Sequence, residues 1–177
     1  MLAVAHDLFY WQGIRATGVD TLAAAAGVAP TTLYRLFPSK DDLVAAYVER
    51  AARDYRGWFD ATVEAAGSDP RERILALFEA LHEQVQPEHC RGCPFLMALT
   101  ELPDRGHAAH RHAVATKAWV RQRFGALVED LQVDEPEALA DQLTLLFEGV
   151  YASVQALGAA GPAARARDIA QRMLSVT

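Results

Sequence analysis

The chain of 177 residues contains only two cysteines, Cys90 and Cys93, so a disulfide framework is excluded. It has no apolar run long enough to cross a bilayer and no signal-peptide pattern, and we therefore expect a cytoplasmic protein with no membrane partner. It also lacks a glycine-rich phosphate loop, a nucleophile elbow and an H-E-x-x-H metal motif. These absences argue against an enzyme, and no cofactor is expected.

Positive charge is also scarce. The formal net charge is −6, whereas nucleic-acid-binding proteins are often basic. The acidity is uneven, because residues 1–56 hold six Lys/Arg and six Asp/Glu while the remainder holds 11 basic and 17 acidic side chains. A DNA-binding module in the first part of the chain would therefore be neutral. It would make few phosphate contacts and would gain much of its affinity from dimerisation.

No segment has the alternation typical of a β-strand, and apolar periodicity predicts helices from end to end. We count nine, three in an N-terminal domain (residues 1–47) and six in a second domain (residues 48–177). The sequence therefore predicts an all-α fold. One helix, over residues 39–66, has no break and is expected to run from the first domain into the second. Other helices are predicted over residues 104–131, from 135 to 158, and from about 162 to 173.

Residues 19–40 are the most informative stretch, because they predict two short helices joined by a glycine turn. The first helix stops at Gly27, which takes the left-handed conformation of a sharp corner most cheaply. The second opens with Pro30 in its first turn, where a missing N–H costs nothing.

The side chains of the second helix divide into two sets. Leu33, Leu36 and Phe37 are spaced to face inward. Facing outward are then hydroxyl, aromatic and guanidinium groups, from Thr31, Thr32, Tyr34 and Arg35. A short helix that presents such groups is what reading of the DNA major groove requires.

A longer motif over residues 2–47 includes this hairpin. Its members are Leu8-Phe9, Gly13, Thr17, Val19, Leu22-Ala23, Ala26-Gly27-Val28, Thr32-Leu33-Tyr34, Phe37, Ser39-Lys40 and Leu43. The motif closely resembles the N-terminal domain of tetracycline-repressor-like (TetR/AcrR) transcriptional regulators. The sequence departs from the family pattern at three positions, with Thr31 in place of glycine, Leu36 in place of histidine, and Ala29 in place of a capping serine.

The resemblance implies a regulator, most simply a repressor, that binds double-stranded DNA at a palindromic operator as a homodimer. Together with the helix geometry, it assigns Tyr34 and Lys40 to phosphate contacts, with Thr17 and the helix N-termini adding backbone donors. Arg35, Thr31 and Thr32 are the candidates for contacts with base edges, because arginine reads guanine and threonine offers a hydroxyl or a methyl group.

TetR-like regulators dimerise through their last two helices, which form a four-helix bundle with those of the partner. In this chain the apolar stripes of the last two predicted helices are candidates for that interface. The predicted interface residues are Leu143, Phe147, Val150, Val154, Leu157, Ile169 and Met173. Part of such a stripe must also belong to the core of the chain itself.

The resemblance further implies a cavity for a small-molecule effector that releases the protein from DNA. The candidate lining residues are Trp58, Phe59, Phe78, Leu81, His82, Phe95, Leu99, Trp119, Arg123, Phe124, Glu148 and Tyr151. Aromatic residues at helical spacing are more often simple core, whereas the polar members carry more information if they are buried. The ligand is not identified by the sequence.

Cys90 and Cys93 form a C-x-x-C pair, followed by His107 and His110 at a spacing compatible with zinc. The pair could also be a redox couple near a helix start. Packing inside the next helix is the simplest interpretation, and no metal site is assigned. Two alternative functions stay open, a thiol or metal sensor that uses Cys90 and Cys93, and a helical adaptor without DNA activity.

Overall fold

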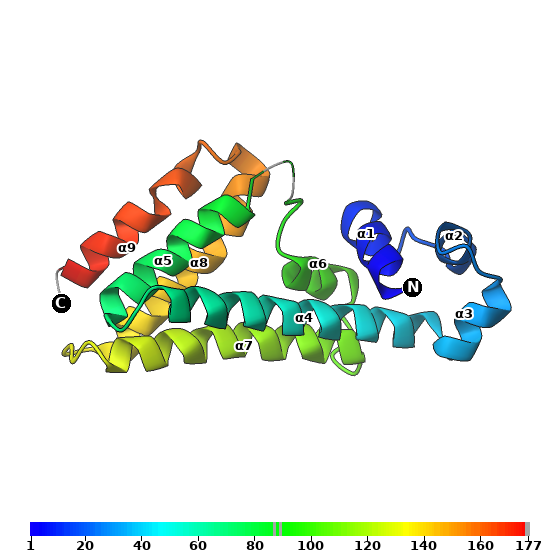
Figure 1. The fold of residues 1–177 in the computed structure, drawn as a ribbon, viewed down its shortest axis with the longest axis horizontal. Coiled ribbons are helices and arrows are strands. Elements are labelled where there is room, and N and C mark those ends of the chain that lie inside the picture. The colour runs from blue at the N-terminus through cyan, green and yellow to red at the C-terminus, as the bar shows by residue number, and fades with distance from the viewer. Residues whose placement is uncertain (87, 89, 176–177) are drawn as a thin grey trace. The chain divides into compact units, whose positions relative to one another are not determined.

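The structure, a computed structural model, describes residues 1–86, 88 and 90–175, and these residues contain helices and no strand (Figure 1). The described helices are α1 (Leu2–Gln12), α2 (Val19–Ala25), α3 (Pro30–Leu36), α4 (Lys40–Ala65), α5 (Pro70–Gln84), α6 (Pro94–Glu101), α7 (Ala108–Glu129), α8 (Pro136–Leu157), the 3-10 helix η1 (Pro162–Arg165) and α9 (Ala166–Ser175). The predicted all-α fold is confirmed.

Local signals explain where many of these helices begin. Proline is the first residue of α3, α5, α6 and α8, where its missing N–H has no intrahelical acceptor to lose. The Asp69 side chain accepts a hydrogen bond from the Arg71 N–H at 2.8 Å and so caps α5. Ser39 does the same for α4, because its Oγ accepts from the Asp42 N–H at 3.1 Å.

Two predicted boundaries are wrong for identifiable reasons. The helix expected from residue 104 begins only at Ala108, because Asp104 forms a turn with Gly106 and His107 caps the helix through its ring. The last helix is preceded by a turn of 3-10 helix that starts at Pro162, and α9 extends to Ser175.

The chain divides into two compact units, each described here by itself. Unit 1 combines Met1–Asp54 with Pro94–Thr116. Unit 2 combines Tyr55–Cys93 with the described residues from Lys117 onward. The two long helices α4 and α7 contribute residues to both units. The predicted domain boundary at residue 47 stays a prediction, but α6 and the first part of α7 cluster with the N-terminal helices.

Unit 1 has a small core in which α1 packs on α2 and α2 packs on α3. Its largest fully buried side chains include Phe9, Leu22, Leu33 and Leu43. The ring of Phe9 lies 5.5 Å from that of Tyr47 on α4.

Unit 2 is built around four phenylalanines, Phe59, Phe78, Phe124 and Phe147, none more than 1% exposed. Five pairs of their ring centroids lie 5.3–6.1 Å apart. Around this cluster α9 packs on α5 and α8, and the Arg71 guanidinium donates to the Leu174 carbonyl near the end of α9.

Candidate DNA-binding surface and effector region

The corner between α2 and α3 is a tight turn at Gly27. Its φ of 66° lies in the left-handed region, which a glycine adopts without steric cost. The turn is closed by two backbone hydrogen bonds, from Gly27 to Ala24 at 3.1 Å and from Val28 to Ala23 at 3.0 Å. Ala29 follows as the N-cap of α3 and supplies no side-chain hydrogen bond. Without a side-chain cap, the start of α3 has to be stabilised by the packing of its apolar side chains.

The outer face of α3 presents the groups expected for DNA. Thr31 and Arg35 are exposed, and Tyr34 is 48% exposed, whereas Leu33 has no exposed surface. Thr32 is half-buried. Lys40, the first residue of α4, is also half-buried and lies next to the Ser39 cap.

The structure corrects the sequence prediction for Leu36 on this surface and shows what the Thr17 side chain does. Leu36 was expected to face inward but is 55% exposed, because the helix ends there and the chain turns inward at the half-buried Phe37 instead. Thr17 is 1% exposed, and its hydroxyl donates to the Gly13 carbonyl at 2.7 Å. The Thr17 side chain therefore stabilises the connection between α1 and α2 and is not available to a phosphate.

The predicted effector-pocket residues fall into different environments. Those without exposed surface are Phe59, Phe78, Leu81, Phe95 and Phe124, none above 1%. These five side chains pack in the core of the structure, and their place in an effector pocket stays a prediction. Phe95 and Leu99 moreover belong to unit 1, whereas the other candidates belong to unit 2.

The remaining candidates in unit 2 are half-buried or polar. The Trp119 ring has the guanidinium carbons of Arg56 and Arg123 at 5.4 and 5.9 Å from its centroid. Arg123 also forms an ion pair with Asp60, with 2.8 Å between Nη2 and Oδ1. The Nδ1 of His82 is buried and has no hydrogen-bond partner among the described residues. Trp58 is half-buried beside the buried Tyr55 and Phe59 rings.

A partly buried polar cluster in unit 2 contains two of the predicted residues, Glu148 and Tyr151. The Lys117 ammonium lies 2.6 and 2.9 Å from the two carboxylate oxygens of Glu148. The same ammonium lies 5.9 Å from the ring centroid of Tyr55 and 5.7 Å from that of Tyr151. The Tyr151 hydroxyl donates to the Gln84 side-chain oxygen at 3.2 Å. Lys117, Tyr55 and Gln84 were not predicted from the sequence.

Burial governs the protonation of this cluster. It raises the pKa of Tyr55 well above the usual 10.0, and the nearby Glu148 and Cys93 act in the same direction. The pKa of Tyr151 is raised well above 10.0 first by burial and then by Tyr55 and Cys93. Both phenols are therefore neutral hydrogen-bonding groups at physiological pH, and the ion pair of Lys117 and Glu148 carries the charge.

The predicted dimer residues on α8 are mostly core. Leu143 and Phe147 have no exposed surface, and Val150 and Val154 are at most 7% exposed, so they pack within their own chain. By contrast Leu157 is 66% exposed, Ile169 is 40% exposed and Met173 is half-buried. The sequence analysis missed Leu145, which at 74% is more exposed than any of these. It lies two residues from both Leu143 and Phe147, on the opposite side of α8 from the buried arc.

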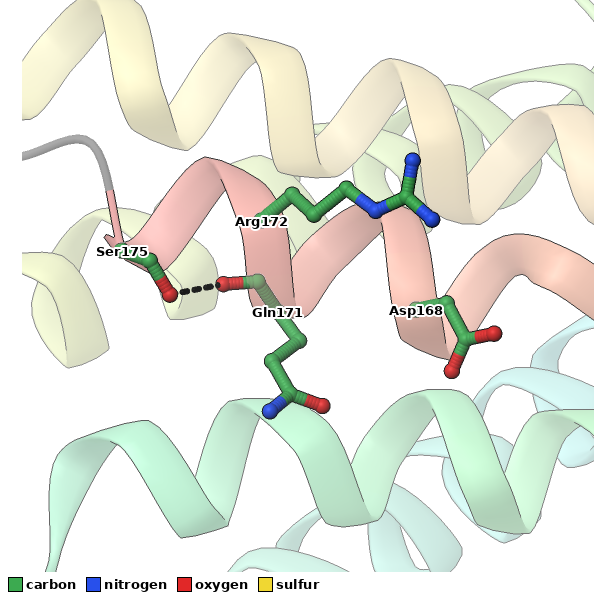
Figure 2. A pocket seen from close by; sticks show the side chains of 4 residues that line it. All are labelled: Asp168, Gln171, Arg172 and Ser175. Carbon is green, nitrogen blue, oxygen red and sulfur yellow. Dashed lines mark hydrogen bonds between the residues drawn. The ribbon is translucent and has the colours of Figure 1, made fainter.

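Two open grooves follow this outer surface. One, of about 240 Å³, is lined by apolar or small residues of α8, η1 and α9, among them Leu145, Gly149, Ser153 and Ile169. The other, of about 350 Å³, is polar and runs along α9, lined by Asp168, Gln171, Arg172 and Ser175 (Figure 2). In it the Ser175 hydroxyl donates to the Gln171 carbonyl at 2.8 Å.

The proposed zinc ligands are not brought together. Among the described residues no three His, Cys, Asp or Glu side chains are grouped so as to hold a metal ion. The Cys90 thiol lies 3.8 Å from the Gly92 carbonyl, and Cys93 is buried before α6. His110 bonds the Leu102 carbonyl, and His107 caps α7.

No helix in the described part of the chain is both long and apolar enough for a membrane span.

A glycine-cornered helix pair that exposes hydroxyl, phenol and guanidinium groups, carried on an all-helical chain, defines a helix-turn-helix DNA-binding protein. The family model for bacterial regulatory proteins of the tetR family matches residues 1–47. The chain belongs to the TetR family of transcriptional regulators.

Relatives of known description agree over most of the chain. The crystal structure of the TetR-type protein sav143 of Streptomyces avermitilis matches with a TM-score of 0.83 and 32% identity, over 99% of this chain and 94% of that one. The HTH-type transcriptional regulator YjdC of Escherichia coli is 28% identical over 84% of this chain and 78% of its own length. The HTH-type transcriptional repressor KstR2 of Mycolicibacterium smegmatis is 28% identical over 68% of this chain and 60% of its own length.

The raised tyrosine pKa values predict how stability depends on pH. In the unfolded chain Tyr55 and Tyr151 lose their protons near the ordinary pKa of 10.0, whereas the folded state holds them at higher pH. The folded state therefore binds more protons above pH 10.0, and the free energy of unfolding should fall as pH rises past that value. Urea unfolding from about pH 8 to about pH 11 measures this decline.

The variant Tyr55→Phe should make the decline shallower, because one of the two buried groups no longer titrates. Tyr34→Phe is the matched control, since Tyr34 is 48% exposed, and it should leave the slope unchanged. Equal slopes in wild type and Tyr55→Phe would contradict the assignment.

Proposed function

We propose that the protein is a homodimeric repressor that binds a palindromic operator through α3 and is released by a small-molecule effector. The observation that carries the proposal is the outer face of α3, where Thr31, Tyr34 and Arg35 are exposed just after the Gly27 corner. Repression is supported by the name of the relative KstR2. The division of labour is that residues 1–47 read DNA and residues 48–177 bind the effector and dimerise. A cytoplasmic location follows from this role.

Within residues 1–47, which we call the reader, different side chains contact phosphates and bases. Tyr34 and Lys40 bind phosphate, because Tyr34 is exposed on α3, Lys40 is the first residue of α4, and both offer a donor. Arg35 is suited to guanine and Thr31 to a methyl group or a base edge. Thr32 is half-buried, so it contacts a DNA base only if the base lies beside the helix α3. Since residues 1–56 carry no net charge, each subunit makes few phosphate contacts.

Replacement of Tyr34 or Lys40 by alanine tests the DNA-binding face. Selection from a random DNA pool first supplies the operator, and fluorescence anisotropy then measures affinity against salt. We expect each variant to weaken binding by about 10-fold, and Lys40→Ala, which removes a charge, also to reduce the salt slope by about 1 per subunit.

The matched control is Arg53→Ala, which removes an exposed cation of α4 that is paired with Glu49. It should leave operator affinity unchanged. If Tyr34→Ala and Lys40→Ala bind like wild type, the face is wrongly assigned. If wild type binds no duplex, the helical adaptor is favoured.

The dimer interface is proposed on the outer side of α8 and α9. Exposed leucines and isoleucine gather there, namely Leu145, Leu157 and Ile169. Ala152 and Ala156 are exposed on the same helix α8, and small residues permit close approach of a partner helix. A two-fold dimer would match two recognition helices to successive major grooves, roughly 34–36 Å apart.

Leu145→Glu tests this interface, because it adds a charge where a partner helix would pack. We expect the dimer to dissociate into folded monomers, observed by sedimentation velocity together with circular dichroism. Val114→Glu changes a residue of unit 1 that is 48% exposed and should leave the dimer intact. A monomeric wild type, or a Leu145→Glu dimer as stable as wild type, would refute the interface.

The effector site is proposed at the polar cluster of Lys117, Glu148, Tyr55 and Tyr151. The side chains of Lys117 and Glu148 are 17% and 21% exposed, so this ion pair is partly shielded from water and still has surface that a ligand could reach. The ammonium, the carboxylate and two neutral phenols together offer donors and acceptors to a polar group on an otherwise apolar ligand. Differential binding to two conformations would then change operator affinity.

A thermal-shift screen of small molecules tests the effector site. A ligand at about 100 times its Kd should stabilise the wild type by about 2.7 kcal/mol. The double variant Lys117→Met/Glu148→Gln removes both charges together, so neither is left buried and unpaired. It should unfold near the wild-type temperature and lose the ligand response. A retained response would place the effector elsewhere.

A further inference from the structure

The segment Glu101–His107 lies in unit 1, in the same compact unit as the reader helices. It joins α6 to α7 and is remote in sequence from residues 1–47. Two of its side chains nevertheless contact the reader, one on each side of the helix-turn-helix.

The first contact precedes α2. The two carboxylate oxygens of Glu101, the last residue of α6, accept hydrogen bonds from the backbone N–H groups of Ile14 and Arg15, at 3.1 and 2.8 Å. These N–H groups come directly after the end of α1, and Ile14 is only 4% exposed. The carboxylate therefore pairs two backbone donors with charge-assisted hydrogen bonds.

The backbone around this contact is shaped to receive the carboxylate. Gly13 has a φ of 101°, and a Cβ there would lie 3.4 Å from Glu101 Oε2. Thr17 closes the same loop from the other side through its bond to the Gly13 carbonyl. Glu101 and Thr17 together fix the path of residues 13–18, and this path determines where α2 begins.

The second contact follows α3. The Nδ1 of His107 accepts the Ala109 N–H at 3.1 Å, so in the neutral ring the proton lies on Nε2. That nitrogen is 3.5 Å from Oδ1 of Asp41, near the start of α4. The segment thus hydrogen-bonds the entry to the helix-turn-helix through Glu101 and lies near its exit through His107, whose Nε2 has no hydrogen-bond partner among the described residues.

We propose that Glu101 is a positioning residue of the reader, which sets the orientation of α2 and α3 and thereby the operator half-site spacing that the dimer accepts. The inference rests on the proposed function, because half-site spacing is defined only for a DNA-bound dimer. It goes beyond it by assigning specificity for spacing to a side chain that is remote from the DNA face in sequence.

The test compares Glu101→Ala with wild type on two duplexes, the selected operator and the same operator with one base pair inserted between the half-sites. The ratio of the two affinities measures spacing discrimination. We expect wild type to discriminate and Glu101→Ala to lose at least about 10-fold of that ratio, with affinity for random duplex unchanged. A merely structural role would lower the unfolding temperature but leave the ratio unchanged.

Two further variants sharpen the test. Glu101→Gln keeps the size of the side chain but offers only one acceptor oxygen, so it should give an intermediate ratio, and it decides the matter if Glu101→Ala does not fold. Glu49→Ala removes an exposed carboxylate of α4 in the same unit and should match wild type.

The outcomes separate the two proposals. Failure of wild type to bind any duplex, or to form a dimer, overturns the proposed function. Wild type that binds and discriminates, with Glu101→Gln and every folded Glu101 variant equal to it in ratio, overturns the positioning role and leaves the proposed function intact.

Discussion

The burial of Leu33 is the constraint on which the reader helix depends. With seven residues, α3 is too short to be stable by itself in water. Its one fully buried side chain holds it against unit 1 and fixes its rotation about its own axis. Because side chains leave a helix at fixed angles, the same contact leaves Tyr34 and Arg35 exposed. The candidate DNA-binding face is therefore a consequence of packing at the Gly27 corner.

Unit 2 contains an apolar cluster of phenylalanines and a polar cluster around Lys117 and Glu148. The four phenylalanine rings are densely packed and supply the hydrophobic stabilisation that a small helical unit needs. The cluster of Lys117 and Glu148 instead holds two charges that are partly shielded from water, a cost that close pairing and two aromatic rings offset. A site that must recognise a polar ligand and respond to it needs such groups, and a purely apolar core could not provide them.

Unit 1 contains more of the chain than the N-terminal helices that form the helix-turn-helix. The family model stops at residue 47, yet contacts also bring Pro94–Thr116 into the unit of the reader. This second stretch begins with α6, and the carboxylate of Glu101, the last residue of α6, accepts a hydrogen bond from the Arg15 N–H. The contacts that Glu101 and His107 make with residues 1–47 lie within unit 1.

The sequence by itself determined what is local: the helices, their proline starts, the Gly27 corner, and which groups α3 offers to DNA. These follow from backbone preferences and periodicity within a few residues. Only the tertiary structure decided that Leu36 is exposed, that Thr17 is internal, and that Leu145 rather than Leu143 faces outward. It also brought Lys117 to Glu148 and Glu101 to Ile14. The physical reason is that periodicity identifies the apolar side of a helix but not which other helices pack against it. Lys117 and Glu148 are separated by 31 positions in the sequence, and Ile14 and Glu101 by 87, so whether they form hydrogen bonds depends on how the helices pack.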